Sequence, residues 1–149
     1  MTRITNVGVG LIMLIGAAVG LAGFGAAAQV AKTKSVDGAK VYIISPKNGD
    51  TVSSPVTVQF GLKGMGVAPA GVTQANTGHH HLLIDVDQMP DFSMPLANNE
   101  QIRHFGAGQT EVELTLPAGK HTLQLVLGDY LHIAHDKPLT SEKITITVK

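Results

Sequence analysis

Short runs of apolar and β-branched residues, most of them alternating with polar ones, recur along the chain after residue 40. The runs lie at residues 41–44, 56–60, 81–86, 111–116, 121–127 and 143–148. Alternation with a period of two is typical of a strand that is buried on one face. Stretches rich in proline, asparagine and glycine favour turns between the runs. The pattern therefore predicts about six or seven short strands and no amphipathic helix in this part of the chain.

Two of these runs, residues 111–116 and 121–127, are separated only by the turn sequence Pro117 to Lys120. Alternating runs joined by a short turn with glycine indicate a β-hairpin. Residues 61–78 and 87–99 carry several glycines or prolines and little pattern, so we expect long connections there, the first with room for one short strand. Together these elements predict an all-β domain, an immunoglobulin-like antiparallel β-sandwich, with a small barrel as the alternative.

The N-terminal segment has a different pattern, in which Arg3 precedes a long uncharged and largely apolar stretch. A charged start, an apolar centre and a small-residue end such as Ala26-Ala27-Ala28 are typical of a secretory signal peptide. A retained membrane anchor is the alternative, because the apolar stretch is long enough to cross a bilayer. The domain is therefore expected to be exported, periplasmic or secreted. We expect a signal helix over residues 1–28, a flexible leader over residues 29–39 and the β-sandwich domain over residues 40–149.

Composition narrows the classes of partner. The formal net charge is zero, and the chain has no tryptophan, two tyrosines, four phenylalanines and no basic stripe. Nucleic-acid binding needs a basic surface and often aromatic stacking, so nucleic acid is excluded as a partner. A membrane contact is expected only through the signal segment, if that segment is kept. The chain has no cysteine and so no disulfide, which leaves stability to the hydrophobic core.

All seven histidines lie between His79 and His135. Neutral imidazole is a common ligand of zinc and copper. On a strand, His79 and His81 share one face, at a spacing of roughly 7 Å that suits two ligands of one ion, and His80 lies on the other face. Either face can be the core; if the even-numbered positions pack inward, His79 and His81 point outward together and His80 is structural. The alternative is that His79 and His81 only face solvent or hydrogen-bond to neighbouring loops.

A second pair, His132 and His135, has the spacing H-x-x-H in a connection between two predicted strands. Loop side chains often bind ligands, and a sandwich brings the ends of non-consecutive strands together. The predicted metal ligands are His79, His81, His132 and His135, with His104 in reserve.

Three other features have both a functional and a structural interpretation. Asp129 either orients a histidine or stabilises a turn, and the turn is favoured. His121, at the start of a strand, is expected to be structural, like the corner tyrosine of immunoglobulin folds that bonds back to the main chain. Met89 and Met94, each followed by proline, are either Cu(I) ligands or apolar filler at the core edge, and filler is favoured.

Several motifs match a known family in order and with similar spacing. They are residues 78–85 (GHHHLLID), 104–111 (HFGAGQTE), 116–125 (LPAGKHTLQL) and 127–129 (LGD), followed by His132, His135, Pro138 and Ser141. Over most of the predicted mature chain, the sequence resembles the exported bacterial family known as domain of unknown function 4399. The resemblance implies a secreted all-β module whose biochemical role is unassigned.

Two departures bear on that resemblance. Residues 133–138 lack the proline before His135 and the pair of prolines after it that we expect in the family, so a less rigid loop is expected here. The chain also lacks the methionine and histidine spacing of periplasmic copper chaperones, and their activity does not carry over.

The residues predict an exported, non-catalytic binding protein for a transition metal, copper first and zinc second. The chain has no cysteine, and no serine, histidine and aspartate arrangement lies in a recognisable nucleophile setting. A hydrolytic zinc held by three histidines and a water is the catalytic alternative. The main alternative is an immunoglobulin-like structural or protein-interaction module of the cell envelope in which the histidines pack and hydrogen-bond.

Overall fold

The computed structural model describes residues 31–149. The predicted signal helix, over residues 1–28, lies outside the described residues. Within residues 31–149, no helix has the length and hydropathy needed to cross a membrane.

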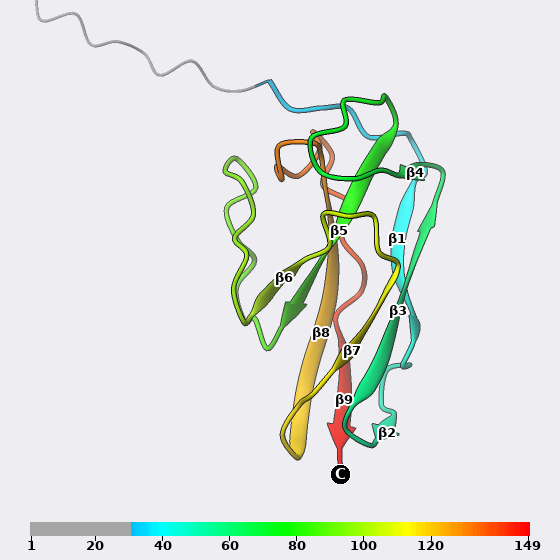
Figure 1. The fold of residues 1–149 in the computed structure, drawn as a ribbon, viewed down its shortest axis with the longest axis vertical. Helices are drawn as coiled ribbons and strands as arrows, with labels where there is room; N and C mark the ends of the chain where they lie inside the picture. The colour runs from blue at the N-terminus through cyan, green and yellow to red at the C-terminus, as the bar shows by residue number, and fades with distance from the viewer. Residues whose placement is uncertain (1–30) are drawn as a thin grey trace, which may run out of the picture. The chain divides into compact units, whose positions relative to one another are not determined.

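The described residues form nine β-strands in two sheets (Figure 1). The strands are β1 (Lys40–Ser45), β2 (Thr51–Val52), β3 (Val56–Lys63), β4 (Gly66–Val67), β5 (Thr77–Ile84), β6 (Ile102–His104), β7 (Glu111–Leu114), β8 (Gly119–Gly128) and β9 (Ile144–Val148). The first sheet has the order β1-β3-β7, and the second has the order β2-β9-β8-β5-β4, with β6 paired beside β5. All pairings are antiparallel except β2 with β9 and β4 with β5. The prediction of an all-β sandwich is confirmed.

The main core lies between the two sheets. It contains Val58 and Phe60 from β3 and, from β5, the even-numbered Leu82 and Ile84. His80 faces the same side, with its ring centroid 5.3 Å from that of Phe60. Of the two orientations that the sequence left open for this strand, the one with the even-numbered positions inward is therefore correct.

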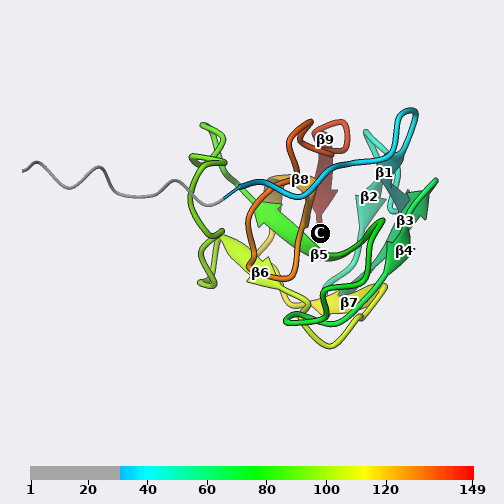
Figure 2. The same cartoon turned by 90° about the horizontal axis from the view of Figure 1, so that it is seen from above.

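The second sheet is also covered on its other face. Leu83 of β5 and Val126 of β8 pack there against Leu96, Ile102 and Ala134. Seen from above, the loop between β5 and β6 and the loop after β8 lie on this side of the sheet (Figure 2). Because both faces are covered, every residue of β5 after Thr77 is buried, and its outward side chains are enclosed by protein.

The predicted hairpin between residues 111–116 and 121–127 is wrong. β7 pairs with β3 in the first sheet, whereas β8 pairs with β5 and β9 in the second. The turn between them therefore crosses from one sheet to the other. Alternation shows only that a strand has one buried face, and both strands bury that face in the shared core from opposite sides.

His121 of β8 hydrogen-bonds to Asp85, which directly follows β5, and to the turn before β8. Its Nδ1 donates a hydrogen bond to Asp85 Oδ2 (2.7 Å) and its Nε2 donates one to the Pro117 carbonyl oxygen (3.0 Å). Asp85 Oδ1 accepts a further bond from the Thr122 N–H (2.7 Å). The bond to Pro117 is the bond back to the main chain expected from the corner tyrosine. Since both ring nitrogens face acceptors, this arrangement favours the doubly protonated imidazolium.

The pH dependence of stability tests this arrangement. The hydrogen bond to Asp85 raises the pKa of His121 above its ordinary value, and burial opposes the shift. A raised folded-state pKa gives stability that is complete below pH ~6.5, the unfolded value, and is lost as the pH rises through the folded value. The buried histidines with lowered pKa values contribute the opposite slope, so the test compares two proteins. With a chelator present, we expect the advantage of the wild type over His121→Gln in free energy of urea unfolding to shrink as the pH rises above ~6.5. An advantage that is the same below and above this pH would contradict the assignment.

Candidate metal centre

Four histidines from three separate segments converge on the outer face of the second sheet. They are His79 and His81 of β5, His104 of β6 and His132 of the loop after β8, and one ring nitrogen from each lies within 4.8 Å of the others. The ring centroids of His104 and His132 are closest, at 4.6 Å, and those of His81 and His132 are farthest apart, at 6.1 Å. Among the described residues, this is the one group of histidine and carboxylate side chains with such convergence.

Strand register brings three of the four rings together. His79 and His81 point outward because the even-numbered residues of β5 point into the core. β6 pairs antiparallel with β5 so that His104 lies directly opposite His81. The fourth ring arrives from the loop, where His132 Nδ1 lies 3.1 Å from His79 Nε2, and the two share a hydrogen bond.

Two glycines leave space for two of the rings. A Cβ atom at Gly106 would lie 2.2 Å from Cε1 of His104, and one at Gly128 would lie 2.7 Å from Cε1 of His81. Both distances are far below van der Waals contact, so each imidazole occupies the volume that a larger residue would fill. The two glycines therefore help to determine where these rings lie.

Burial keeps the central imidazoles neutral. His79 and His81 are fully buried, and His104 and His132 are half-buried. Burial, aided by the neighbouring histidines, lowers the pKa of His79 to about 4 and that of His81 to about 3. Burial and the nearby His132 also lower the pKa of His104. Metal ions bind neutral imidazole, so at neutral pH these lone pairs are available without losing a proton first.

Several of the buried ring nitrogens have no hydrogen-bond partner among the described residues. They include both nitrogens of His81, Nδ1 of His79 and Nε2 of His104. An unpartnered polar atom in a protein interior costs free energy, typically about 1–3 kcal/mol. A coordinated cation would satisfy one nitrogen of each ring.

The distances between ring nitrogens fit one ion if the more widely spaced rings move closer together. Nitrogens bound to a tetrahedral zinc lie roughly 3.3 Å apart, given metal–nitrogen bonds of about 2.0–2.1 Å. The pair His79 and His132 is already at 3.1 Å, and a pair at the upper limit of 4.8 Å must close by about 1.5 Å.

His135 does not join this centre, although the sequence placed it there. Its side chain is buried, and Nε2 lies 3.3 Å from the carbonyl oxygen of Thr77, to which it donates. His104, the predicted reserve, occupies the fourth position. Nothing in the sequence marks its pairing with His81, because β6 is a three-residue strand without alternation.

The other residues that the sequence singled out lie outside the four-histidine group. Asp129 Oδ1 accepts bonds from two backbone N–H groups of the following turn, as the turn interpretation predicted. Met89 and Met94 are 39% and 60% exposed, so neither fills the core. His80 faces the core, its two ring nitrogens have no partner among the described residues, and burial lowers its pKa to about 4, opposed only in part by the nearby Gln109 backbone.

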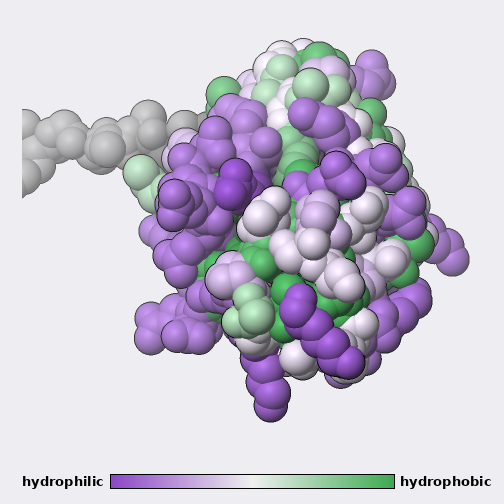
Figure 3. All heavy atoms as spheres, turned by 60° about the horizontal axis from the view of Figure 1, so that its bottom comes forward, coloured by the Kyte–Doolittle hydropathy of each residue, from purple (hydrophilic) through white to green (hydrophobic). Residues whose placement is uncertain are grey.

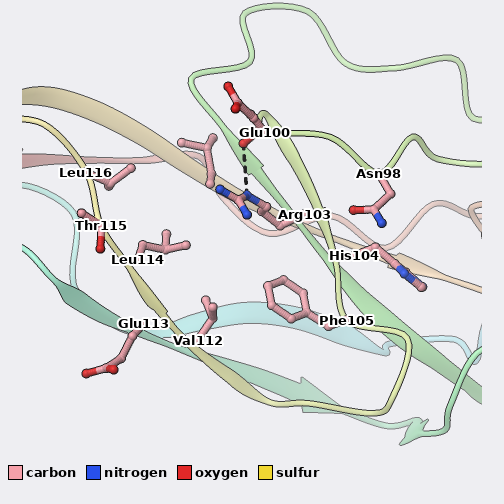
Figure 4. Close-up of a pocket in the computed structure, with 11 residues that line it drawn as sticks. Asn98, Glu100, Arg103, His104, Phe105, Val112, Glu113, Leu114, Thr115 and Leu116 are labelled. Carbon is pink, nitrogen blue, oxygen red and sulfur yellow. Dashed lines mark hydrogen bonds between the residues drawn. The ribbon is translucent and has the colours of Figure 1, made fainter.

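A separate hollow of about 640 Å³ lies between the edges of the two sheets, next to β6 and β7. Phe105, Val112 and Leu114 line it, and His104 stands at its border with the ring directed away from these apolar side chains (Figure 4). The hollow and the four-histidine centre thus lie on different sides of His104.

Comparison with known proteins places the chain in a family. A family model described as "Domain of unknown function (DUF4399)" matches residues 58–149. The chain belongs to this family. The DUF4399 region includes all four histidines of the centre, whereas β1 and β2 precede it. No curated protein and no solved structure matches the chain.

Proposed function

We propose that this DUF4399 protein is an exported binding protein for a divalent transition metal, copper first and zinc second. The ligands are His79, His81, His104 and His132. The observation that carries the proposal is the convergence of four imidazoles from β5, β6 and the loop after β8, with buried and unpartnered ring nitrogens.

The donor set accounts for the choice of metal. Imidazole suits copper, zinc and nickel, and affinity for a given nitrogen site rises toward Cu(II) and falls again at Zn(II). Cu(I) prefers thiolate and thioether ligands. The chain has no cysteine, and both loop methionines are exposed on their own segment. Four imidazoles without sulfur therefore favour Cu(II) and Zn(II) over Cu(I).

The number of ligands favours binding over catalysis. Catalytic zinc sites keep one position for water, whereas structural zinc sites have four protein ligands. Four histidines fill a tetrahedral site, and we propose no enzymatic activity. The half-buried His104 and His132 form the side from which an ion enters.

Export is the part of the proposal that rests on the sequence alone. The signal pattern over residues 1–28 predicts translocation, and a domain without cysteine does not depend on disulfide formation after export. We propose a periplasmic or secreted protein.

The alternative is an interaction module with purely structural histidines. The large exposed apolar side chains of the described residues are spread over several segments, including Tyr42, Val72 and Leu131. On the face turned toward the viewer in Figure 3, apolar atoms are interrupted by hydrophilic side chains. Scattered apolar residues are ordinary on a soluble domain and do not define a docking surface.

Calorimetric titration of the purified protein with Cu(II) and Zn(II) tests the proposal. We expect one ion per chain in the wild type, much weaker binding in His104→Ala, and wild-type affinity in His135→Ala, whose ring lies outside the centre. Thermal unfolding checks that both variants are folded. Wild-type binding no tighter than about 10 μM, a free energy of only about 7 kcal/mol, would contradict the proposed function. Loss of binding in His135→Ala alone would contradict this ligand set.

Gly106→Ala adds a test of geometry that removes no ligand. The new methyl group occupies the volume of the His104 imidazole, which is half-buried and can rotate outward. We expect Gly106→Ala to weaken metal binding as His104→Ala does, with little change in unfolding temperature.

A further inference from the structure

Asp129 directly follows β8 and has only 2% of its surface exposed. Its Oδ1 accepts hydrogen bonds from the N–H groups of Leu131 (2.8 Å) and Ile133 (3.0 Å). The backbone closes the same turn, because the Asp129 N–H donates to the Ile133 carbonyl (2.8 Å) and the His132 N–H donates to the Asp129 carbonyl (2.9 Å). One carboxylate oxygen therefore holds the backbone on both sides of His132.

His132 lies in this turn with a left-handed backbone, at φ 64°. That conformation is unfavourable for residues other than glycine and persists where surrounding contacts hold it. With the backbone in this conformation, the His132 ring lies against His79, with its Nδ1 3.1 Å from Nε2 of His79, and His135, three residues later, is not part of the group. A turn without the bonds to Asp129 would lose this direction.

The other carboxylate oxygen is held from the N-terminal side of the domain. Asp129 Oδ2 accepts a hydrogen bond from Thr33 Oγ1 (3.0 Å), and the Thr33 carbonyl accepts one from the Asp136 N–H (2.9 Å). Asp136 Oδ1 accepts a further bond from the Ser35 N–H (3.0 Å). Residues 33–35 belong to the stretch predicted as a flexible leader, and they hydrogen-bond to the loop after β8 on both sides of His132.

We propose that Asp129 is a positioning residue of the metal centre. It holds residues 129–133 so that His132 reaches His79, and Thr33 holds Asp129 in turn. The proposal rests on the proposed function, because the positioned ligand matters only if the four histidines take an ion.

Two substitutions separate position from charge. Asp129→Ala removes both acceptors, whereas Asp129→Asn keeps an oxygen for the two N–H groups and offers an amide that donates to Thr33 Oγ1. Asp91→Ala is the matched control, because Asp91 also accepts two hydrogen bonds within a turn, from Ser93, but in the exposed loop of residues 87–99.

Affinity for Cu(II), from calorimetry on the full chain, is the first measurement. Removing a residue that supports a metal ligand typically costs about 10–100-fold in affinity, and we expect a loss in that range for Asp129→Ala. Asp129→Asn should recover most of it, and Asp91→Ala should bind as the wild type does. When His132 is already replaced by alanine, adding Asp129→Ala should weaken Cu(II) binding further by no more than the small loss that Asp129→Asn causes in the wild type.

The second measurement counts the nitrogens bound to Cu(II) by electron paramagnetic resonance, which a purely structural role would not change. We expect one nitrogen fewer in Asp129→Ala, as in His132→Ala. A folded Asp129→Ala with wild-type affinity and nitrogen count would overturn the proposal while leaving the proposed function intact. If Asp129→Ala does not fold, Thr33→Val decides: we expect weaker Cu(II) binding in it, and unchanged affinity overturns the proposal. A wild type that binds no Cu(II) defeats both proposals.

Discussion

Replacing His81 by leucine should weaken Cu(II) and Zn(II) binding by more than about 100-fold, since changes to residues that only support the ligands already cost about 10–100-fold. His81 lies on β5 between β6, where it pairs with His104, and β8, and both its ring nitrogens are buried without a partner among the described residues. Leucine fills much of the same volume and offers no lone pair. Competition titration with a chelator of known affinity measures the loss.

His80→Leu is the matched control for His81→Leu. The two histidines are neighbours in one strand and both are fully buried, but His80 faces the core between the sheets. His80→Leu should bind metal as the wild type does. It should also be at least as stable, because an apolar side chain replaces a buried polar one without partners. Similar losses of binding in the two variants would show that folding, rather than coordination, is being measured.

Saturation with Zn(II) should raise the unfolding temperature by on the order of 10 °C or more. A ligand that binds only the folded state at about 1,000 times its Kd adds about 4 kcal/mol to the free energy of unfolding. In a domain of this size each kcal/mol corresponds to roughly 2–8 °C. The effect should be large here because the metal would join β5, β6 and the loop after β8, which are separate in sequence.

Thermal unfolding followed by circular dichroism, with and without Zn(II), measures this shift. A chelator should reverse the shift, and His81→Leu should show almost none. An equal shift in wild type and His81→Leu would mean that zinc acts elsewhere on the protein. No shift in unfolding temperature at saturating zinc would contradict a metal site that forms only in the folded protein.

The face of β5 that carries His79 and His81 could be predicted in part from sequence. Alternation restricted the strand to two orientations, and only the structure selects the one in which His80 points inward. The sequence could not show that the outer face is covered too. That covering depends on Leu83 and Val126 meeting side chains such as Leu96 and Ala134 from irregular connections, which have no periodic signal.

The sequence predicted His135 as a metal ligand, whereas the structure has His104 in the metal centre, and this difference has a physical reason. The spacing of His132 and His135 in sequence does not show where either ring points, because the left-handed backbone at His132 is set by hydrogen bonds to Asp129. His104 depends on strand pairing, and pairing partners cannot be deduced from one strand's own pattern. The failure of the hairpin between β7 and β8 has the same cause.

A crystal structure of the protein with Zn(II), with anomalous difference maps at the zinc edge, would show whether the four histidines bind one ion. We expect one strong peak per chain, about 2.0–2.1 Å from a ring nitrogen of each of His79, His81, His104 and His132. A peak bound by His135 in place of His104, or no peak at these four rings at saturating zinc, would contradict this expectation.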